Sequence, residues 1–189
     1  ILEITYNTGV AAFTNVTAFE TFKSGADTAN QSFTTVDGNV AATGSLTIDM
    51  SAQATNSYVV DISAETNGAI TITGGAAAST ITLSASSMGD TFTGGAAADG
   101  VTVAIGQLTS ADTINGAGGT DTLTFSDAGI LSDADLTNVS NFESLATAAG
   151  TNTLVLGTEF EGSGISTITT STGAETITFG SGVTTAVTV

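Results

Sequence analysis

The chain repeats itself at short intervals, and this repeat limits the folds open to it more than any other feature. Three segments align without gaps: ITITGGAAASTIT at 70–82, DTFTGGAAADGVT at 90–102 and DTINGAGGTDTLT at 112–124. Each has the pattern of a strand, a Gly/Ala turn and a second strand, because β-branched residues favour strands and glycine favours tight turns. A weaker fourth copy, ETITFGSGVTTAV, lies at 175–187.

A repeat of about 20 residues built from short strands predicts a β-solenoid. One coil cannot bury its apolar side alone, whereas stacked coils bury a continuous core and pair each strand with the coils above and below. The predicted fold class is therefore all-β, a right-handed parallel β-helix or β-roll. The leucine-rich repeat has a similar period, but its L-x-x-L-x-L-x-x-N pattern and its helical half are missing here.

We expect one solenoid over residues 1–189, with its best-defined coils at 68–125. Because the chain starts with Ile and ends in an apparent strand, we expect a piece of a longer polypeptide or a processed subunit. ILEITY at the start and TTAVTV at the end have the pattern of uncapped β edges, which pair with more chain or another subunit. No apolar run is long enough to predict a transmembrane helix.

A longer duplication is also expected, between residues 1–24 and 123–147. FTNVTAFETF at 13–22 resembles LTNVSNFESL at 136–145. The Phe, Val and Leu residues of both segments are predicted to lie in the core, as apolar residues usually do. Their spacing fits a short helix or 3₁₀ segment leading into a strand, without selecting between the two.

The charge balance excludes several classes of partner. The chain has 18 acidic residues against one basic residue, Lys23, so its net charge is −17 at pH 7. Nucleic acid needs Lys or Arg on the protein, and an anionic membrane repels such a chain. Cys and His are absent, which removes disulfides, the usual zinc sites and the commonest general base. The remaining oxygen ligands suit calcium, and magnesium less well.

Two turns come close to the calcium-binding nonapeptide G-G-x-G-x-D-x-U-x, in which U is apolar. Residues 116–124, GAGGTDTLT, depart from it only at Ala117, and residues 94–102, GGAAADGVT, depart only at Ala97. Glycines let successive carbonyl oxygens face one point, and the aspartate adds a carboxylate there. A neighbouring turn would supply the rest of a shell of about six to eight oxygens.

This pattern predicts a set of calcium ligands, with a metal-free Gly/Asp turn as the alternative. The predicted ligands are Asp90, Asp99, Asp112, Asp121, Gly94, Gly116, Gly118, Gly119 and Asp127. The copy at 70–82 has Ile70 and Ser79 in place of aspartate, so it should bind no ion or contribute carbonyls alone. Glu175 is a weaker candidate, because Thr184 stands where its turn would need a second acid.

Other acidic residues allow more than one interpretation. The segment FSDAGILSDADL at 125–136 contains Asp127, Asp133 and Asp135. It could hold another calcium ion, form a solvated loop, or cap a short helix that starts near Ser132. Asp49 and Asp61 lie between apolar neighbours, and we expect them to be outward-facing strand residues.

With these aspartates and glycine turns, residues 68–125 resemble the repeats-in-toxin (RTX) group of secreted bacterial proteins. The Thr/Ala/Gly-rich composition and the segment LTNVSNFESL are most similar to RTX-type surface-layer proteins and large surface adhesins. The resemblance implies type I secretion, a bacterial cell-surface location and a β-helix ordered by extracellular calcium. The glycine pattern is degenerate, however, and the coils are longer than the two-nonapeptide turn of a simple β-roll.

Three functions are therefore weighed. The first is a structural extracellular protein, a calcium-stiffened solenoid that self-assembles into a surface layer or filament or joins neighbouring domains of the same chain. The second is a binding module, either a repeat block of a giant adhesin or an ice-binding face of threonine rows. A flat, regular T-x-T array on one face would favour it. An enzyme is disfavoured, because Arg and His are absent.

Overall fold

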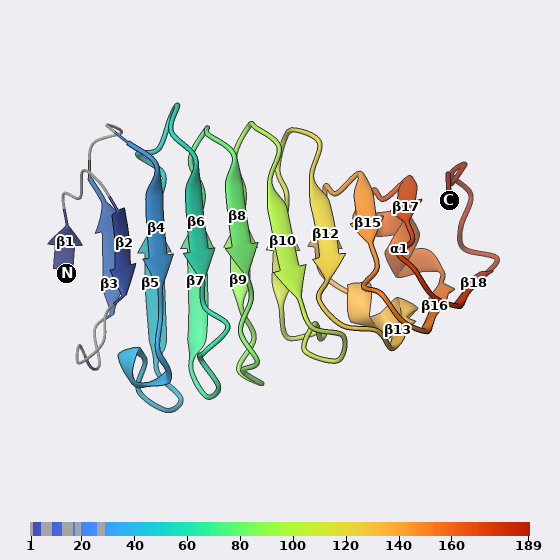
Figure 1. Cartoon of the computed structure of the whole chain (residues 1–189), viewed down its shortest axis with the longest axis horizontal. Coiled ribbons are helices and arrows are strands. Elements are labelled where there is room, and N and C mark those ends of the chain that lie inside the picture. The colour runs from blue at the N-terminus through green and yellow to red at the C-terminus, as the bar shows by residue number, and fades with distance from the viewer. Residues whose placement is uncertain (1, 5–8, 13–16, 18–19, 26–28) are drawn as a thin grey trace.

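The computed structural model describes residues 2–4, 9–12, 17, 20–25 and 29–189, which form a parallel β-solenoid (Figure 1). The first sheet has seven strands in the order β1-β3-β5-β7-β9-β11-β14, and the second has eight in the order β17-β15-β12-β10-β8-β6-β4-β2. All strand pairs in these sheets are parallel; those of the central coils include β7·β9, β9·β11, β8·β10 and β10·β12. The prediction of an all-β parallel solenoid is confirmed.

The strands are short, and most have three to five residues. In the first sheet they are β1 (Leu2–Ile4), β3 (Thr21–Ser24), β5 (Ser45–Asp49), β7 (Ala69–Thr73), β9 (Thr91–Thr93), β11 (Thr113–Asn115) and β14 (Val139–Ser140). In the second sheet they are β2 (Gly9–Ala12), β4 (Gln31–Thr34), β6 (Tyr58–Asp61), β8 (Ser79–Thr82), β10 (Gly100–Val103), β12 (Thr122–Phe125), β15 (Ser144–Ala146) and β17 (Thr167–Thr169).

One coil consists of a strand of the first sheet, a turn, a strand of the second sheet and a return loop. The register follows the sequence repeat, because Thr71 pairs with Thr91 and Thr91 pairs with Thr113. The three best copies of the repeat form the strand pairs β7/β8, β9/β10 and β11/β12. The fourth copy forms β18 (Glu175–Phe179), but its second half forms no strand, and the isolated bridge of Thr188 to Thr167 comes directly after it.

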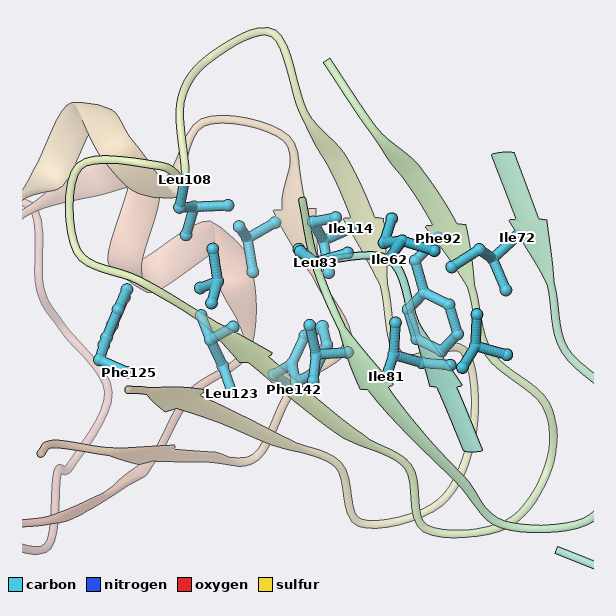
Figure 2. Packing of buried hydrophobic residues seen from close by; sticks show 14 of the residues in the cluster. Ile62, Ile72, Ile81, Leu83, Phe92, Leu108, Ile114, Leu123, Phe125 and Phe142 are labelled. Carbon is cyan, nitrogen blue, oxygen red and sulfur yellow. The ribbon is translucent and has the colours of Figure 1, made fainter. Parts of the chain in front are cut away.

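The core lies between the two long sheets, where alternate residues point inward. Phe92 of β9 and Ile114 of β11 face Ile81 of β8 and Leu123 of β12 (Figure 2). All four side chains are fully buried. This alternation follows from the period of two in a strand, which places the apolar residues on one face and the threonines on the other.

The later coils add a third sheet and short helices. The third sheet has the order β13-β16-β18, with β13 (Ile130–Ser132) and β16 (Asn152–Leu156). The helices of these later coils are the 3₁₀ helix η2 (Asp133–Leu136) and the α-helix α1 (Thr158–Ser163). Another 3₁₀ helix, η1 (Asp37–Asn39), lies in an early coil between β4 and β5. In the segment 125–136, residues 126–129 form a loop, Ile130–Ser132 form β13, and η2 begins directly after Ser132, so the loop interpretation holds only for 126–129 and the short helix is found where that alternative put it.

Part of the predicted duplication lies outside the described residues. Phe13, Val16 and Phe19 lie outside the described residues, whereas Phe22 is buried in β3. In the later segment the predicted core residues Leu136, Val139, Phe142 and Leu145 are all buried. The module duplication between 1–24 and 123–147 stays a prediction.

Candidate functional site

The four aspartates of the glycine turns each stand directly before a strand. Asp90 precedes β9 and Asp112 precedes β11 in the first sheet, while Asp99 precedes β10 and Asp121 precedes β12 in the second. The strand registers therefore stack them in two columns at two corners of the coil. We call Asp90 and Asp112 the first corner column, and Asp99, Asp121 and Glu143 the second. The four aspartates are 1–4% exposed.

In the second corner column, each carboxylate accepts the backbone N–H of the residue that occupies the same place one coil earlier. The N–H and the hydroxyl of Ser79 both donate to Asp99 Oδ1, each at 2.7 Å. The N–H of Asp99 donates to Asp121 Oδ1 at 2.7 Å, and that of Asp121 donates to Glu143 Oε2 at 2.7 Å. The column is thus a ladder of carboxylate–amide hydrogen bonds along the stack.

The first corner column has the same arrangement. Asp90 Oδ1 accepts the N–H of Ile70 at 3.1 Å, and Asp112 Oδ1 accepts the N–H of Asp90 at 2.7 Å. The second oxygen of each carboxylate is held within its own return loop. The Ser84 hydroxyl donates to Asp90 Oδ2 at 2.6 Å, and the Thr109 N–H donates to Asp112 Oδ2 at 2.8 Å. Burial raises the pKa of Asp90, against these hydrogen bonds.

The glycine that opens each turn makes room for a buried acceptor. A Cβ on Gly94 would overlap Asp99 Oδ2, and one on Gly116 would crowd Asp121 Oδ2. In the first of the three turns, the aspartate is replaced by Ser79, and the Tyr58 hydroxyl lies against Gly74 instead. The spacing of glycine and aspartate in the motif is therefore explained by packing of the carboxylate under the turn.

The residue after this glycine decides whether the acceptor is satisfied. Gly95 N–H donates to Asp99 Oδ2 at 2.9 Å. In the following coil Ala117 takes the place of Gly95, has a positive φ of 68° and donates its N–H to Asn115 Oδ1 at 2.8 Å. Asp121 Oδ2 is consequently buried without a hydrogen-bond partner.

This missing donor changes the acidity of Asp121. Burial is the largest effect and raises its pKa to about 6, while the N–H of Asp99 lowers it and the charges of Asp99 and Glu143 raise it further. The Asp121 carboxylate therefore binds a proton more readily than an ordinary aspartate does.

The turn carbonyls are also engaged in contacts between coils. Gly95 O accepts the N–H of Gly118 at 2.9 Å, and Asn115 O accepts the N–H of Gly94 at 2.8 Å. Gly116 N–H donates to Ser140 O at 3.1 Å. Gly119, with φ of 132°, lies against the carbonyl of Ala97, where a Cβ would overlap it. These oxygens and amides link successive turns to one another.

At three of the four aspartates, the carboxylate oxygens are poorly suited to bind calcium, because hydrogen bonds already occupy them. Both oxygens of Asp90, Asp99 and Asp112 accept hydrogen bonds. Over the residues that the structure describes, no three acidic side chains are arranged to hold a metal ion. Of these four aspartates only Asp121 keeps an oxygen without a hydrogen-bond partner, and elsewhere in the described residues Glu65 Oε2 and Glu175 Oε2 are also buried without one. The structure does not test calcium binding itself, so the calcium ligands stay a prediction.

Further acidic residues serve neighbouring coils in the same way. Asp127 Oδ1 accepts the N–H of Ile105 at 2.6 Å. Asp133 accepts the N–H of Gly157 at 2.6 Å and of Phe160 at 2.9 Å, and so caps α1 from the preceding coil. Burial raises the pKa of Asp133, but the backbone donors outweigh it and the pKa is lowered. Asp135 instead accepts the N–H of Ser132 at 2.8 Å, within its own loop.

The remaining predicted acids lie as expected or outside the columns. Asp49 and Asp61 end β5 and β6 on the outer faces. Glu175 accepts from the side-chain amide of Asn152 at 2.9 Å, away from both corners. Sequence reasoning missed Glu143 and Tyr58. Extending the repeat by one more step beyond Asp121 would have found Glu143.

Comparison with known proteins adds no identification. No protein-family model, no curated protein and no solved structure matches the chain. The resemblance to RTX proteins therefore depends on the motif residues alone. Among the described residues, no helix combines the length and the apolar character that crossing a membrane requires.

Proposed function

We propose that the chain is a structural component of an extracellular bacterial surface, a rigid solenoid rod that assembles into a layer or filament. The observation that carries the proposal is the in-register stack of parallel coils, in which the corner residues as well as the core are buried. Such a stack transmits load along its axis through backbone hydrogen bonds. The cell-surface location and type I secretion follow from the resemblance to RTX proteins.

Assembly through the later end is supported by its exposed apolar residues. Ile177 and Phe179 of β18 continue the columns of Leu154 and Leu156, with which they pair in register. Leu154 and Leu156 are each 1% exposed, whereas Phe179 is 42% exposed. A further coil, from more chain or from another subunit, would bury this surface and extend the sheet edge at β18.

The charge of the chain determines the conditions for assembly. Copies with a net charge of −17 repel one another, so assembly should need divalent cations or screening salt. Calcium is the predicted cation, and extracellular calcium modules bind at roughly 10⁻⁴–10⁻³ M. Of the four corner aspartates, Asp121 alone has an oxygen left for a cation, and that is one of the six to eight oxygens that calcium takes.

The test is electron microscopy of the purified chain at millimolar calcium and in chelator. We expect ordered sheets or filaments in calcium and dispersed particles in chelator. Dispersed monomers at every calcium concentration, even at high protein concentration, would contradict a self-assembling role. Any rise in melting temperature caused by calcium should be lost in Asp121→Asn.

A second candidate, a binding module, is favoured by the outer face of the first sheet. Thr21, Thr47, Thr71, Thr91 and Thr113 pair in register in five successive strands. Two residues along, threonine recurs only at Thr73 and Thr93, which pair in register with Asp49 and Asn115 on either side. Neighbouring strands lie about 4.8 Å apart, so methyl and hydroxyl groups recur at that spacing. Of these five strands, β7 and β9 carry the T-x-T pair that an ice-binding face would use.

An ice-growth assay separates the two candidates. The binding module predicts that the chain slows ice recrystallisation as a monomer, and that Thr91→Tyr in the middle of the column abolishes this activity. Thr102→Tyr, on the outer face of the second sheet, is the matched control. Unchanged ice growth in the presence of the wild-type chain removes the ice-binding candidate.

A further inference from the structure

We propose that the aspartates of the two corner columns join neighbouring coils as acceptors for backbone amides, so that the solenoid is held together at its corners without a metal ion. This inference does not depend on the proposed surface role. It assigns Asp90, Asp99 and Asp112 a function different from the one that the glycine–aspartate motif predicts, and gives the missed Glu143 the same acceptor role.

The first argument is geometric. A corner interrupts both sheets, so the amide of the residue before a strand needs a partner from outside the ladder, and a buried amide without one is costly. In the corner columns the carboxylate of the next coil is that partner. The links from Asp90 to Asp112, from Asp99 to Asp121 and from Asp121 to Glu143 are each 2.7 Å long, the length of a charge-assisted hydrogen bond.

The second argument is electrostatic. Two or more N–H or O–H groups point their positive ends at each of Asp90, Asp99 and Asp112. These donors stabilise a buried anion and oppose a cation in the same place. They also explain how a chain with one basic residue and 18 acidic residues can bury carboxylates at all, because backbone amides replace the missing Lys and Arg.

The third argument comes from the positions where the motif changes. Tyr58 and Ser79 replace aspartate in the second corner column, and the Tyr58 hydroxyl accepts the N–H of Gly75 at 3.0 Å. Asp99 accepts the N–H of Gly95 in the equivalent way at 2.9 Å. A neutral phenol can substitute for a carboxylate as an amide acceptor, but it is a poor calcium ligand. The role conserved between these coils of the chain is therefore the acceptor.

The experiment compares Asp112→Ala with Asp61→Ala, each melted in millimolar calcium and in chelator. Asp112 links two coils and its loop, whereas Asp61 accepts only from Ser63 in its own coil. We expect Asp112→Ala to lower the melting temperature by about 5 °C or more, to the same extent in both buffers. Asp61→Ala should change it by less than about 2 °C.

Each outcome decides the matter. An equal loss for Asp112→Ala in calcium and in chelator supports the inference. A loss confined to calcium would show that Asp112 is a metal ligand and would overturn it. No loss in either buffer would also overturn it, because the acceptor would then contribute nothing. Failure of the wild-type chain to fold in chelator would overturn it as well.

A second measurement covers the case in which Asp112→Ala does not fold. Asp112→Asn keeps one acceptor oxygen, so amide exchange can be followed by NMR on this milder variant. We expect the Asp90 amide to exchange at least about tenfold faster in Asp112→Asn than in the wild-type chain, with or without chelator, while the Asp99 amide is unaffected. Unchanged exchange at Asp90, or a change only in calcium, overturns the inference.

Discussion

At the scale of single residues, the corner aspartates show that the environment of a buried carboxylate depends on which hydrogen-bond donors reach each of its two oxygens. Asp99 has donors on both oxygens, whereas Asp121 has one on Oδ1 and none on Oδ2. The difference lies in the backbone of the turn and in a second residue change. Ala117 has a positive φ and its N–H donates to Asn115 Oδ1. One coil earlier, Thr93 stands in the place of Asn115, and Gly95 donates to Asp99. Two aspartates at equivalent places in the repeat therefore have different hydrogen-bond partners.

Asp121 predicts an unusual pH dependence of stability. Its pKa is about 6 in the folded chain against an ordinary 3.8, so between these values the folded state binds the proton more tightly than the unfolded state. The free energy of unfolding should therefore rise as the pH falls from 7 to about 5. Thermal melts should show a melting temperature some degrees higher at pH 5 than at pH 7, and Asp121→Asn should remove the part due to Asp121 while leaving the part due to the raised pKa of Asp90.

Below this range the sign reverses. The pKa values of Asp49 and Asp133 are lowered by hydrogen bonds that outweigh burial, so their contribution is present above their ordinary pKa and is lost as the pH falls through the lowered values. Stability should thus be greatest in mildly acidic solution. A melting temperature that decreases steadily from pH 7 to pH 4 would contradict the state of Asp121 described here.

At the scale of the turn, the opening glycine carries a strict spatial requirement. A Cβ on Gly94 would overlap both Asp99 Oδ2 and the carbonyl of Gly116, and the backbone there cannot move without breaking contacts between coils. Gly94→Ala should therefore lower the free energy of unfolding by about 2 kcal/mol or more in chemical denaturation. Gly162→Ala is the control, since nothing lies within 4 Å of that Cβ, and it should be neutral or slightly stabilising.

The two departures from the nonapeptide motif should respond in opposite directions to restoring glycine. Ala117 has a φ of 68°, which costs roughly 1–2 kcal/mol for a residue with a Cβ. Ala117→Gly should therefore stabilise the chain by up to about 1 kcal/mol. Ala97 is not among the described residues with positive φ, so Ala97→Gly should cost about 0.5–1 kcal/mol. Denaturant titration measures the free energy of unfolding of both variants, and two changes of the same sign would contradict the prediction.

The turns also show which features of the site can be predicted from the sequence. The repeat predicts the strands on either side of each turn and the position of Asp99 and Asp121 at its end, because strand period and glycine placement are local properties. It does not predict which way a carboxylate points, since a corner that presents oxygens to an ion and one that receives amides share the same residue pattern. The acceptor role of Tyr58 depends on a contact between coils and has no local signal.

At the scale of the whole molecule, stability is distributed along one axis. Each coil contacts only the coils before and after it, so the solenoid opens from its ends inward. The repeat at 70–124 predicts this stack, and the structure confirms it. It does not predict the third sheet or α1, because the later coils depart from the repeat and depend on long-range packing such as the capping of α1 by Asp133.

This arrangement predicts a gradient of amide exchange along the chain. The strands β9 and β10 are enclosed by coils on both sides, and their inward residues Phe92 and Val101 are fully buried. In contrast, β18 is the edge of the third sheet, with Thr176, Thr178 and Phe179 exposed. Hydrogen exchange by mass spectrometry should show protection falling by orders of magnitude from β9 and β10 to β18.

The gradient also separates the two ways in which the corners could be held. If carboxylate–amide bonds join the coils, the order of exchange should be the same in calcium and in chelator, and Phe92→Ala should raise exchange mainly in its own and adjacent coils, with a cost of about 3–5 kcal/mol. If ions join the coils, chelator should flatten the gradient by opening the coils at 90–124 first. Equal exchange rates in all strands would mean that the chain unfolds only as one unit, and would contradict the prediction that the coils open one after another from the ends.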